Sequence, residues 1–516
     1  MKKQKVILFT TAVLAVSVAI TMPMGTAQAG ELRVGYTEDA LTLDPANHRA
    51  RTTQTIIRNM YDGLVTRDPN MKVVPQAAES WKAIDPTTYE VTLQNGITFH
   101  DGSPMTSEDV KYTFDRLTRD GAIGGQTSPR KSLVGPVKEV QIVDGRTVRF
   151  ILSSPWPQFM AFLTLHEVVS KKFTEKVGAD GMSKSVMGSG PYKLAKWRKG
   201  ESVIMERFDG YYGGSQDLKP VGKACSETVI FKIIPENASR VAALLAGDVH
   251  IINDLPPHSV KQVENNANTR VMTVNGTRST FMALNTQKKP FNDIRVRRAV
   301  AYAINRQLIV DKILGGKATL INGILGPDAF GKNKNLPAYE FDIAKSKVLL
   351  AEAGYPNGLD VTLDVTGKDK DIGQAIASLM TKAGIRTKVV VGESSQLTAR
   401  FRTKGKPIDG QMYLTSWGNG SLDPVGIFVP THRTNDRGNS SGYSNSTVDK
   451  LLDAANTETD QAKRAGLYSQ AEAIVNKDLP KVYLWVAQDL YGVSNRLSGW
   501  QPSSDGRINL HDACVK

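Results

Sequence analysis

The stretch FMALNTQKKPFNDIRVRRAVAYAINRQLIVDKIL, residues 281–314, decides how the rest of the chain is organised. Its first residues alternate as in a β-strand, with Phe281 and Ala283 on one side and Met282 and Leu284 on the other. A strand is therefore predicted at the start of this stretch.

A helix is predicted directly after the strand. Lys288–Pro290 breaks the apolar run, and Asp293 stands where an N-cap would. Apolar side chains then recur every four residues in one stripe: Val296, Val300, Ile304 and Leu308. The other face carries Arg295, Arg298, Tyr302 and Arg306. On periodicity alone, this strand and helix are a packing device and indicate no function.

The same stretch resembles the "LN…PF-D-RVR-A-YAI-R" segment of the large periplasmic solute-binding proteins that serve peptide, nickel and opine ABC importers, the extracellular family 5 group. In that family the chain leaves the first lobe and enters the second at this segment. Residues 78–117 resemble a second motif of the family, "W-(x)n-G-x-x-F-H-D-G-x-P-(x)n-DV-Y", and contain a predicted helix capped at residues 106–109. Residues 187–192 resemble a third, "G-T/S-G-P-Y". The resemblance covers essentially the whole mature chain.

The resemblance implies an α/β protein with the two-lobed periplasmic-binding-protein (venus flytrap) fold and an additional subdomain inserted in lobe one. Residues 30–75, 188–284 and 490–516 are expected to form lobe I, residues 76–187 the inserted subdomain, and residues 285–489 lobe II. Strands and helices alternate between residues 343 and 391, which independently indicates an α/β arrangement in lobe II. The lobe crossings, expected near residues 284–286 and 488–493, would form the hinge.

The first 29 residues are predicted to be a cleaved signal peptide. Lys2, Lys3 and Lys5 precede an apolar run, and Ala27-Gln28-Ala29 provides a small-x-small cleavage site. The apolar run is too short for a bilayer span of about 20 residues. The mature chain is therefore expected to be a free periplasmic protein that is not inserted in the membrane.

The composition indicates a basic chain of more than one lobe. Without residues 1–29, 487 of the 516 residues remain, too many for one core, and the loss of three lysines lowers the formal charge from +14 to +11. An exported chain with dispersed basic residues is not expected to bind nucleic acid. The charge indicates either an anionic ligand or a purely solubilising surface.

The chain contains two cysteines, Cys225 and Cys514. In an oxidising compartment they are expected to pair, which would tie the carboxyl terminus to lobe I. The alternative is two separate buried thiols.

Several ligand-lining residues are predicted at the ends of strands, where ligands gather in open α/β sheets. The polar turn after the strand 32–36 offers Tyr36, Glu38 and Asp39. Arg278, just before the strand at the lobe crossing, would bind an anion unless it is an exposed loop residue. By resemblance to peptide binders, the loop after the strand 359–365 offers Lys368 and Lys370 to a ligand carboxylate.

The main site-bearing loop is predicted in residues 409–430, DGQMYLTSWGNGSLDPVGIFVP. A strand at 411–415 leads to the segment Trp417, Gly418, Asn419 and Gly420, which would lie at the cleft. The family has "W-x-x-D-x-x-D-P" here, so the resemblance implies that Trp417 packs against the ligand and that Asp423 matches the second, structural aspartate. The alternative is a core tryptophan followed by a tight glycine turn.

Gly420 stands where the family's first aspartate grips the amino group of a peptide. An unpaired ammonium in a closed cleft would cost several kcal/mol. A free peptide amine is therefore disfavoured unless Glu38 or Asp39 compensates, and the glycines beside Asn419 favour close approach to a sugar or an opine phosphate.

Two patterns that suggest catalysis are rejected. The pair His100-Asp101 matches a family segment in a structural subdomain, and a lone histidine beside a turn is seldom a metal ligand. Residues 438–442 fit G-x-S-x-G but lack the flanking strand and helix that an esterase needs. A hydrolase would also need a nucleophile, a base and an oxyanion site that converge, and no such set is recognisable.

The sequence therefore predicts a monomeric, non-enzymatic, cofactor-free binding protein. Its partners would be a small solute (peptide, opine or sugar derivative) and the transmembrane subunits of an ABC permease. The alternatives are an oligosaccharide or sugar-phosphate binder, and a sensor that presents its ligand to a membrane receptor.

Overall fold

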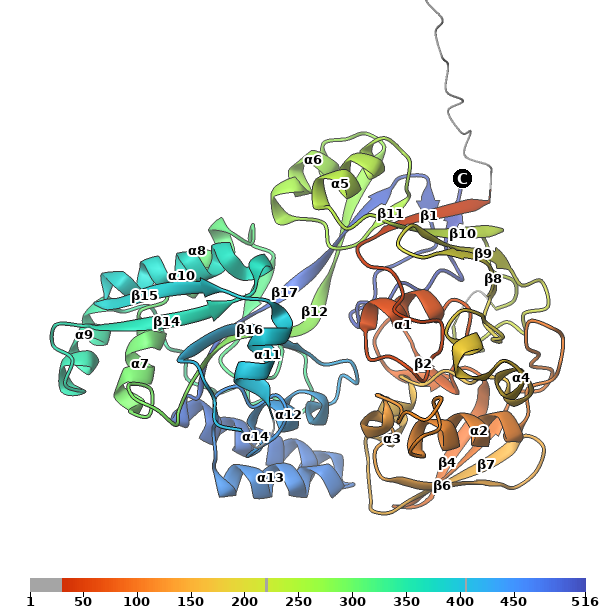
Figure 1. The fold of residues 1–516 in the computed structure, drawn as a ribbon, viewed down its shortest axis with the longest axis horizontal. Coiled ribbons are helices and arrows are strands. Elements are labelled where there is room, and N and C mark those ends of the chain that lie inside the picture. Colours follow the sequence, from red (N-terminus) through yellow and green to blue (C-terminus); the bar gives the residue numbers. More distant parts are fainter. Residues whose placement is uncertain (1–29, 219–220, 404–405) are drawn as a thin grey trace, which may run out of the picture.

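The computed structural model describes residues 30–218, 221–403 and 406–516, so the predicted signal peptide lies outside the described residues. Two lobes, with a subdomain attached to the first, are joined by two long strands in the middle of the molecule (Figure 1). A sheet of 11 strands passes through both lobes in the order β15-β14-β16-β12-β17-β11-β1-β10-β9-β8, with β13 paired to β17. The predicted two-lobed α/β fold is confirmed.

The lobes are connected by β12 (Thr269–Leu284) and β17 (Lys481–Ser494). These strands pair antiparallel, and their register shifts between Asn275 and Ser279. Gly276 lies in this irregular stretch, where an added Cβ would come within 2.5 Å of the carbonyl oxygen of Ala487. Glycine at position 276 therefore allows the two backbones to approach closely where the chain crosses between the lobes.

Lobe I contains the half of the large sheet that is built around β1. Its strands in this sheet are β1 (Glu31–Tyr36), β8 (Tyr192–Arg198), β9 (Ser202–Arg207), β10 (Thr228–Ile233) and β11 (Ile251–Ile252). Its helices are α1 (Arg51–Ile57), α4 (Lys171–Met182), α5 (Asn237–Leu245) and α6 (Val260–Glu264). Met182 of α4 belongs to the lobe I core, although residue 182 falls within the predicted inserted subdomain.

The inserted subdomain is a four-stranded antiparallel sheet in the order β4-β5-β7-β6, covered by helices. Its elements are β4 (Ala78–Asp85), β5 (Thr88–Leu93), β6 (Val137–Ile142), β7 (Thr147–Leu152), α2 (Ser107–Thr118) and α3 (Phe159–Leu163). The predicted capping box is present at α2, where the Asp109 carboxylate accepts a hydrogen bond from the backbone N–H of Thr106 at 2.9 Å. Phe114 of α2 packs edge-on against Phe150 of β7.

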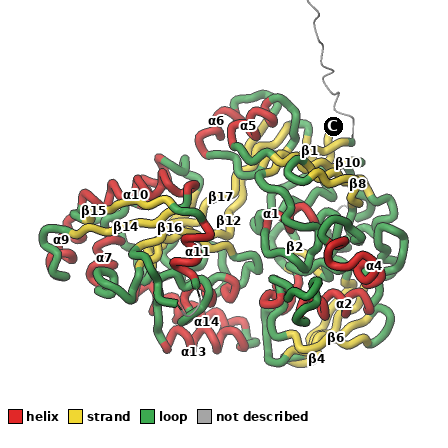
Figure 2. The backbone as a smooth tube through the Cα atoms, in the orientation of Figure 1, coloured by secondary structure: helices red, strands yellow, loops and turns green. Residues whose placement is uncertain are grey.

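Lobe II is a sheet with helices on both faces, seen as yellow strands between red helices in Figure 2. Its other strands are β13 (Ala318–Leu320), β14 (Leu359–Val365), β15 (Ile385–Val391) and β16 (Met412–Gly418). Met282 and Leu284 pack with α7 (Ile294–Tyr302), α8 (Arg306–Lys312), α9 (Ile343–Glu352) and α10 (Lys370–Lys382). Phe281 and Ala283 pack with α11 (Ser394–Arg402), α12 (Phe428–His432), α13 (Ser446–Thr457) and α14 (Gln461–Asp478). The predicted alternation of this strand is confirmed.

The helix predicted after this strand is wrong in its second half. The structure has two helices, and the break after Tyr302 is followed by Asn305, whose side chain caps α8 through the N–H of Leu308 at 2.9 Å. The new helix turns Leu308 outward, with 42% of its surface exposed, and buries Arg306, which is 8% exposed. Arg306 donates to the carbonyl oxygens of Ile321 at 2.7 Å and Tyr483 at 3.0 Å, so it joins the loop and the sheet instead of facing solvent.

The lobe boundary also differs from the predicted one. Residues 281–284 lie in the lobe II cores, whereas Met272 and Val274 pack on the lobe I core. The first crossing is therefore near residues 275–279, earlier than the predicted 284–286. The second crossing lies opposite it, where Gln488 pairs with Asn275.

The carboxyl terminus returns to lobe I and is fixed there. Cys225 and Cys514 form a disulfide with Cα atoms 5.3 Å apart. Two small sheets complete this lobe, one of β18 (Leu497–Ser498) and β19 (Cys514–Val515) and one of β2 (Val65–Arg67) and β3 (Val73–Pro75). In the described ranges, none of the helices is both long and apolar enough to cross a bilayer.

Candidate ligand-binding cleft

A cavity of about 880 Å³ lies between the lobes. Lobe I lines it with Arg51 at the start of α1, and the inserted subdomain with Trp156. Lobe II contributes Trp417 at the end of β16. All three parts of the molecule therefore meet at one cavity, which is large enough for a small organic solute.

Arginine side chains dominate the polar lining of this cavity. We call them the arginine cluster: Arg49, Arg51, Arg130, Arg278, Arg402, Arg437 and Arg507. Arg507 forms an ion pair with Asp505 at 2.7 Å. Within the described ranges, none of the other six guanidinium groups has a carboxylate oxygen within 4.0 Å.

Strand pairing places Trp417 and Gly418 beside the lobe crossing. Gly418 of β16 lies opposite Arg278 of β12, and Trp417 opposite Ser279. An added Cβ at position 418 would lie 3.0 Å from a guanidinium nitrogen of Arg278 and 3.2 Å from one of Arg51. Glycine at 418 therefore leaves room for two guanidinium groups next to each other.

Two guanidinium groups from different segments of lobe II contact the Trp417 ring. The central carbon of the Arg402 guanidinium is 5.2 Å from the ring centroid, and that of Arg437 is 4.7 Å. The indole N–H donates to the carbonyl oxygen of Gly426 at 3.0 Å, which fixes the ring. Cation–π contact and this hydrogen bond hold both arginines at the cavity wall.

Burial lowers the pKa of several guanidinium groups in the arginine cluster, and repulsion between neighbouring arginines lowers it further. Burial lowers the pKa of Arg130 to about 10. Burial also lowers the pKa of Arg278 to about 10, and the neighbouring charge of Arg51 acts in the same direction. The pKa of Arg49 is lowered by burial and by Arg437, which reaches the cavity from the opposite lobe. The guanidinium groups stay charged at neutral pH, so the cavity carries concentrated positive charge.

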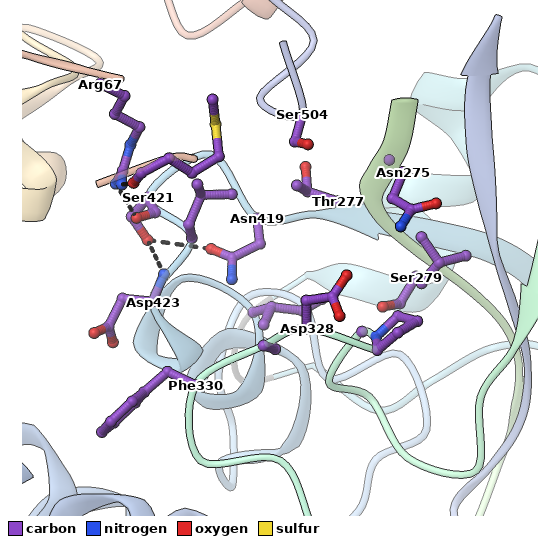
Figure 3. Close-up of a pocket in the computed structure, with 18 of the residues that line it drawn as sticks. Arg67, Asn275, Thr277, Ser279, Asp328, Phe330, Asn419, Ser421, Asp423 and Ser504 are labelled. Carbon is purple, nitrogen blue, oxygen red and sulfur yellow. Dashed lines mark hydrogen bonds between the residues drawn. The ribbon is translucent and has the colours of Figure 1, made fainter. Parts of the chain in front are cut away.

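A second cavity of about 470 Å³ adjoins the first, and Ser421 lines both. Figure 3 shows its polar side chains, among them Asn419, Asp328, Thr277 and Ser504. The Ser421 hydroxyl donates to the Asn419 side-chain oxygen at 3.1 Å, and Arg67 of lobe I donates to the Ser421 carbonyl at 2.5 Å (Figure 3). We call this second cavity the polar chamber.

Six of the predicted ligand-lining residues lie at these two cavities. Trp417, Gly418, Gly420 and Arg278 line the arginine-rich cavity, and Asn419 and Asp423 line the polar chamber. Asp423 accepts from Arg464 at 2.6 Å and from the backbone N–H of Val425 at 3.0 Å. This buried ion pair joins the loop to α14.

The remaining predicted residues lie elsewhere in the described structure. Tyr36 is buried against Phe231 in the lobe I core. The Asp39 carboxylate accepts from the Trp197 indole and the Gly200 N–H, and exposed Glu38 accepts from Thr52. Lys368, in the turn before α10, and Lys370, the first residue of α10, are exposed, and neither belongs to the lining of the two cavities.

Most of the arginine cluster was not predicted from the sequence. Its members come from segments near residues 50, 130, 280, 400, 437 and 507, which only the fold brings together. The basic net charge was the one available signal, and it did not say where the charge would gather. Gly438 of the rejected G-x-S-x-G pattern lies against the Trp417 ring, where an added Cβ would be 2.6 Å away, so this loop packs against the cleft tryptophan.

The described residues offer no cluster of three or more His, Cys, Asp or Glu side chains that could hold a metal ion. His100, which was rejected as a ligand, is half-buried, and its Nε2 lies 3.1 Å from the carbonyl oxygen of Gly190. Gly190 itself lies close to the Met60 backbone, as expected for a glycine that permits close approach.

Comparison with known proteins identifies the family. The model of the bacterial extracellular solute-binding proteins, family 5 (middle), matches residues 72–439. The glutathione-binding protein GsiB of Salmonella typhimurium is 27% identical over 501 residues, 95% of each chain. The periplasmic binding protein DppA of Helicobacter pylori, solved with the peptide STSA, superposes with a TM-score of 0.80 at 26% identity over 94% of this chain and 98% of that one. CtaP of Listeria monocytogenes, an ABC transporter substrate-binding protein, gives a TM-score of 0.84 at 24% identity over 94% and 99% of the two chains. The chain belongs to the family 5 bacterial extracellular solute-binding proteins.

Proposed function

We propose that this protein is the periplasmic binding component of an ABC importer and that it captures an anionic organic solute between its lobes. The observation that carries the proposal is the arginine cluster, six of whose members have no carboxylate oxygen within 4.0 Å of their guanidinium groups in the described chain. The transmembrane subunits of a permease would receive the solute after closure and reopening of the lobes.

The energetics favour an acid as the ligand. Bringing guanidinium groups together in a partly closed cavity is costly, and a bound anion relieves that cost. Each charge-assisted hydrogen bond from arginine to a carboxylate or phosphate contributes about 1.5–3 kcal/mol. The planar guanidinium also matches the two oxygens of such groups, which gives orientation as well as affinity.

The arginine side chains of the cleft and the named ligand of one relative support a class of solute. GsiB is named as a glutathione-binding protein, and glutathione is a peptide with two carboxylates. An acidic peptide, an opine and a sugar phosphate share the anionic groups that the cavity would bind. Position 420 has no carboxylate, and Glu38 and Asp39 lie outside the lining of both cavities, so acid groups and not an amine would supply most of the affinity.

Isothermal titration of the mature protein would test the proposal. The probes would be glutathione, glutamyl-glutamate and glucose 6-phosphate as anions, and alanyl-alanine as a probe without net charge. We expect at least one anion to bind at micromolar concentration and alanyl-alanine to bind at least 100-fold more weakly. Preference for the uncharged dipeptide would contradict the proposal.

Variants would connect the affinity with the cleft. The double change Arg402→Ala/Arg437→Ala should weaken binding of the anion by 100-fold or more, because it removes both guanidinium groups beside Trp417. Trp417→Ala should weaken it at least tenfold through loss of the surface that holds them. Lys370→Ala is the matched control, since it removes an exposed positive charge outside the cavity and should leave affinity within twofold. Equal losses in control and cleft variants would refute the assignment of the site.

A further inference from the structure

One carboxylate in the polar chamber has no partner among the described residues. Asp328 lines the chamber as an exposed residue, and among the described residues its side chain takes part in no hydrogen bond or ion pair. Figure 3 shows it directed into the space between Asn419 and Ser279. The other acid in this lining, Asp423, already pairs with Arg464 at 2.6 Å.

The loop that carries Asp328 is held firmly by the core of lobe II. The buried Glu472 of α14 accepts hydrogen bonds from the backbone N–H groups of Leu325 at 3.1 Å and Asn333 at 2.9 Å, on either side of Asp328. Phe330, two residues further on, packs under the guanidinium of Arg464. The Asp328 carboxylate is therefore presented by a fixed loop, as expected for a group that meets a ligand.

The two cavities are adjacent but opposite in character. One is lined by the arginine cluster, the other contains the unpartnered Asp328, and Ser421 lines both. Gly420 lies at the arginine-rich cavity, and an added Cβ there would meet no heavy atom closer than the Leu165 side chain at 4.0 Å. The residue beside Ser421 therefore leaves space for one ligand to extend from one cavity into the other.

We propose that Asp328 binds a protonated amine of the solute while the arginine cluster binds its acid groups. The cleft would thus select an amphoteric polyacid that carries one amine and at least two negative charges. This inference rests on the proposed function and narrows its substrate class. It assigns to Asp328 the role of specificity-determining residue.

The test uses matched pairs of probes that differ only at the amine. The pairs are glutathione and N-acetylglutathione, glutamyl-glutamate and its N-acetyl derivative, and glucosamine 6-phosphate and N-acetylglucosamine 6-phosphate. Titration would compare the wild-type protein with Asp328→Asn, which keeps the shape of the side chain and removes its charge. Asp328→Glu would show whether a displaced carboxylate restores the preference.

In the wild type we expect the free amine of at least one pair to bind 10- to 100-fold more tightly than its acetylated partner. Asp328→Asn should abolish this preference by weakening the free amine alone and leave the acetylated probe within twofold. Asp371→Asn, an exposed acid on α10, is the matched control and should change neither affinity. Asp436→Asn should also retain the preference, because Asp436 lies in the other cavity and its carboxylate accepts from the Arg437 N–H.

Three results would overturn the inference. They are equal binding of both members of every pair, equal loss of both in Asp328→Asn, and amine-selective loss in Asp436→Asn instead. In each case anions still bind, so the proposed function stands. If neither the six probes nor glucose 6-phosphate binds, both the inference and the proposed function fail.

Discussion

Arginine, and not lysine, suits the positions around Trp417. A guanidinium group can stack on the indole and still donate in its own plane, whereas a lysine ammonium is a compact and strongly hydrated charge. Arg402 illustrates this, because it lies over the Trp417 ring and donates to the Thr415 hydroxyl at 2.7 Å. Residues at this wall are thus oriented before a ligand arrives, which lowers the entropy cost of binding.

The buried Asp62 in lobe I should make the stability of the protein depend on pH. Its carboxyl is buried and accepts from the Gln76 amide at 2.6 Å and the Tyr212 hydroxyl at 2.8 Å. Burial raises the pKa of Asp62 to about 7, above its ordinary value near 4. The folded state therefore holds this proton more tightly than the unfolded state. The resulting stability is present in full below about pH 4 and is lost as the pH rises through 7.

Asp62→Asn should remove this dependence. Between pH 4 and pH 8, the wild type should lose on the order of 4 kcal/mol in free energy of unfolding relative to the variant. Urea denaturation at several pH values would measure it. Asp371→Asn, at an exposed site, should give a difference that does not vary with pH. A constant difference for Asp62→Asn as well would contradict the assigned shift.

At the scale of elements, local sequence patterns predicted most strands and helices. The alternation at Phe281–Leu284, the N-cap at Asp293 and the helix capped at residues 106–109 are all present. The pattern failed after Tyr302, since a four-residue apolar repeat cannot reveal that Asn305 starts a new helix. Tertiary contacts decide there, because Arg306 finds carbonyl partners in the loop and sheet.

The irregular stretch of β12 gives a prediction for the crossing element. In Gly276→Ala the added methyl would come within 2.5 Å of the Ala487 carbonyl, so the two strands must move apart. We expect a loss of about 1–3 kcal/mol of stability, and weaker ligand binding because the lobes would change their relative position. Thermal unfolding and titration would measure both effects.

Gly466→Ala is a matched control within the same fold. Gly466 lies inside α14, and no heavy atom beyond its neighbours and the helix's own backbone approaches within 4 Å of an added Cβ. This substitution should stabilise by about 0.5–1 kcal/mol, as is usual for alanine in a helix. If Gly276→Ala caused no loss of stability or ligand binding either, the close approach of the two strands at the crossing would not require glycine.

At the scale of the whole molecule, the sequence predicted the lobes but only part of the cleft. Trp417, Gly418 and Gly420 could be found because they are neighbours on one segment. Arg49 and Arg437 could not, because they are almost 400 residues apart and meet only when the lobes face each other. Glu38 and Asp39 follow a strand end as predicted, yet both lie outside the cavity lining. The Asp39 carboxylate accepts hydrogen bonds from Trp197 and Gly200 instead.

The disulfide gives a prediction for the molecule as a whole. Cys225 and Cys514 are 289 residues apart in sequence, so their bond closes a loop that contains all of lobe II. Removing it in Cys225→Ser/Cys514→Ser should lower the free energy of unfolding by about 2–5 kcal/mol. Differential scanning calorimetry would measure the change. A reducing agent should lower the melting temperature of the wild type and leave the double variant unchanged; equal sensitivity of both would contradict the prediction.

The opposed arginines have a mechanical consequence for the empty protein. Arg49 and Arg51 belong to one lobe, and Arg402 and Arg437 to the other, so without a ligand their like charges push the lobes apart. The repulsion between the lobes depends on the salt concentration, because counterions screen it. The Debye length shortens from about 30 Å at 0.01 M salt to about 8 Å at 0.15 M. An anionic solute that neutralises these charges removes the repulsion and so favours closure of the lobes. Unliganded protein should therefore be most open in dilute buffer and become more compact as salt is added, even when no solute is present.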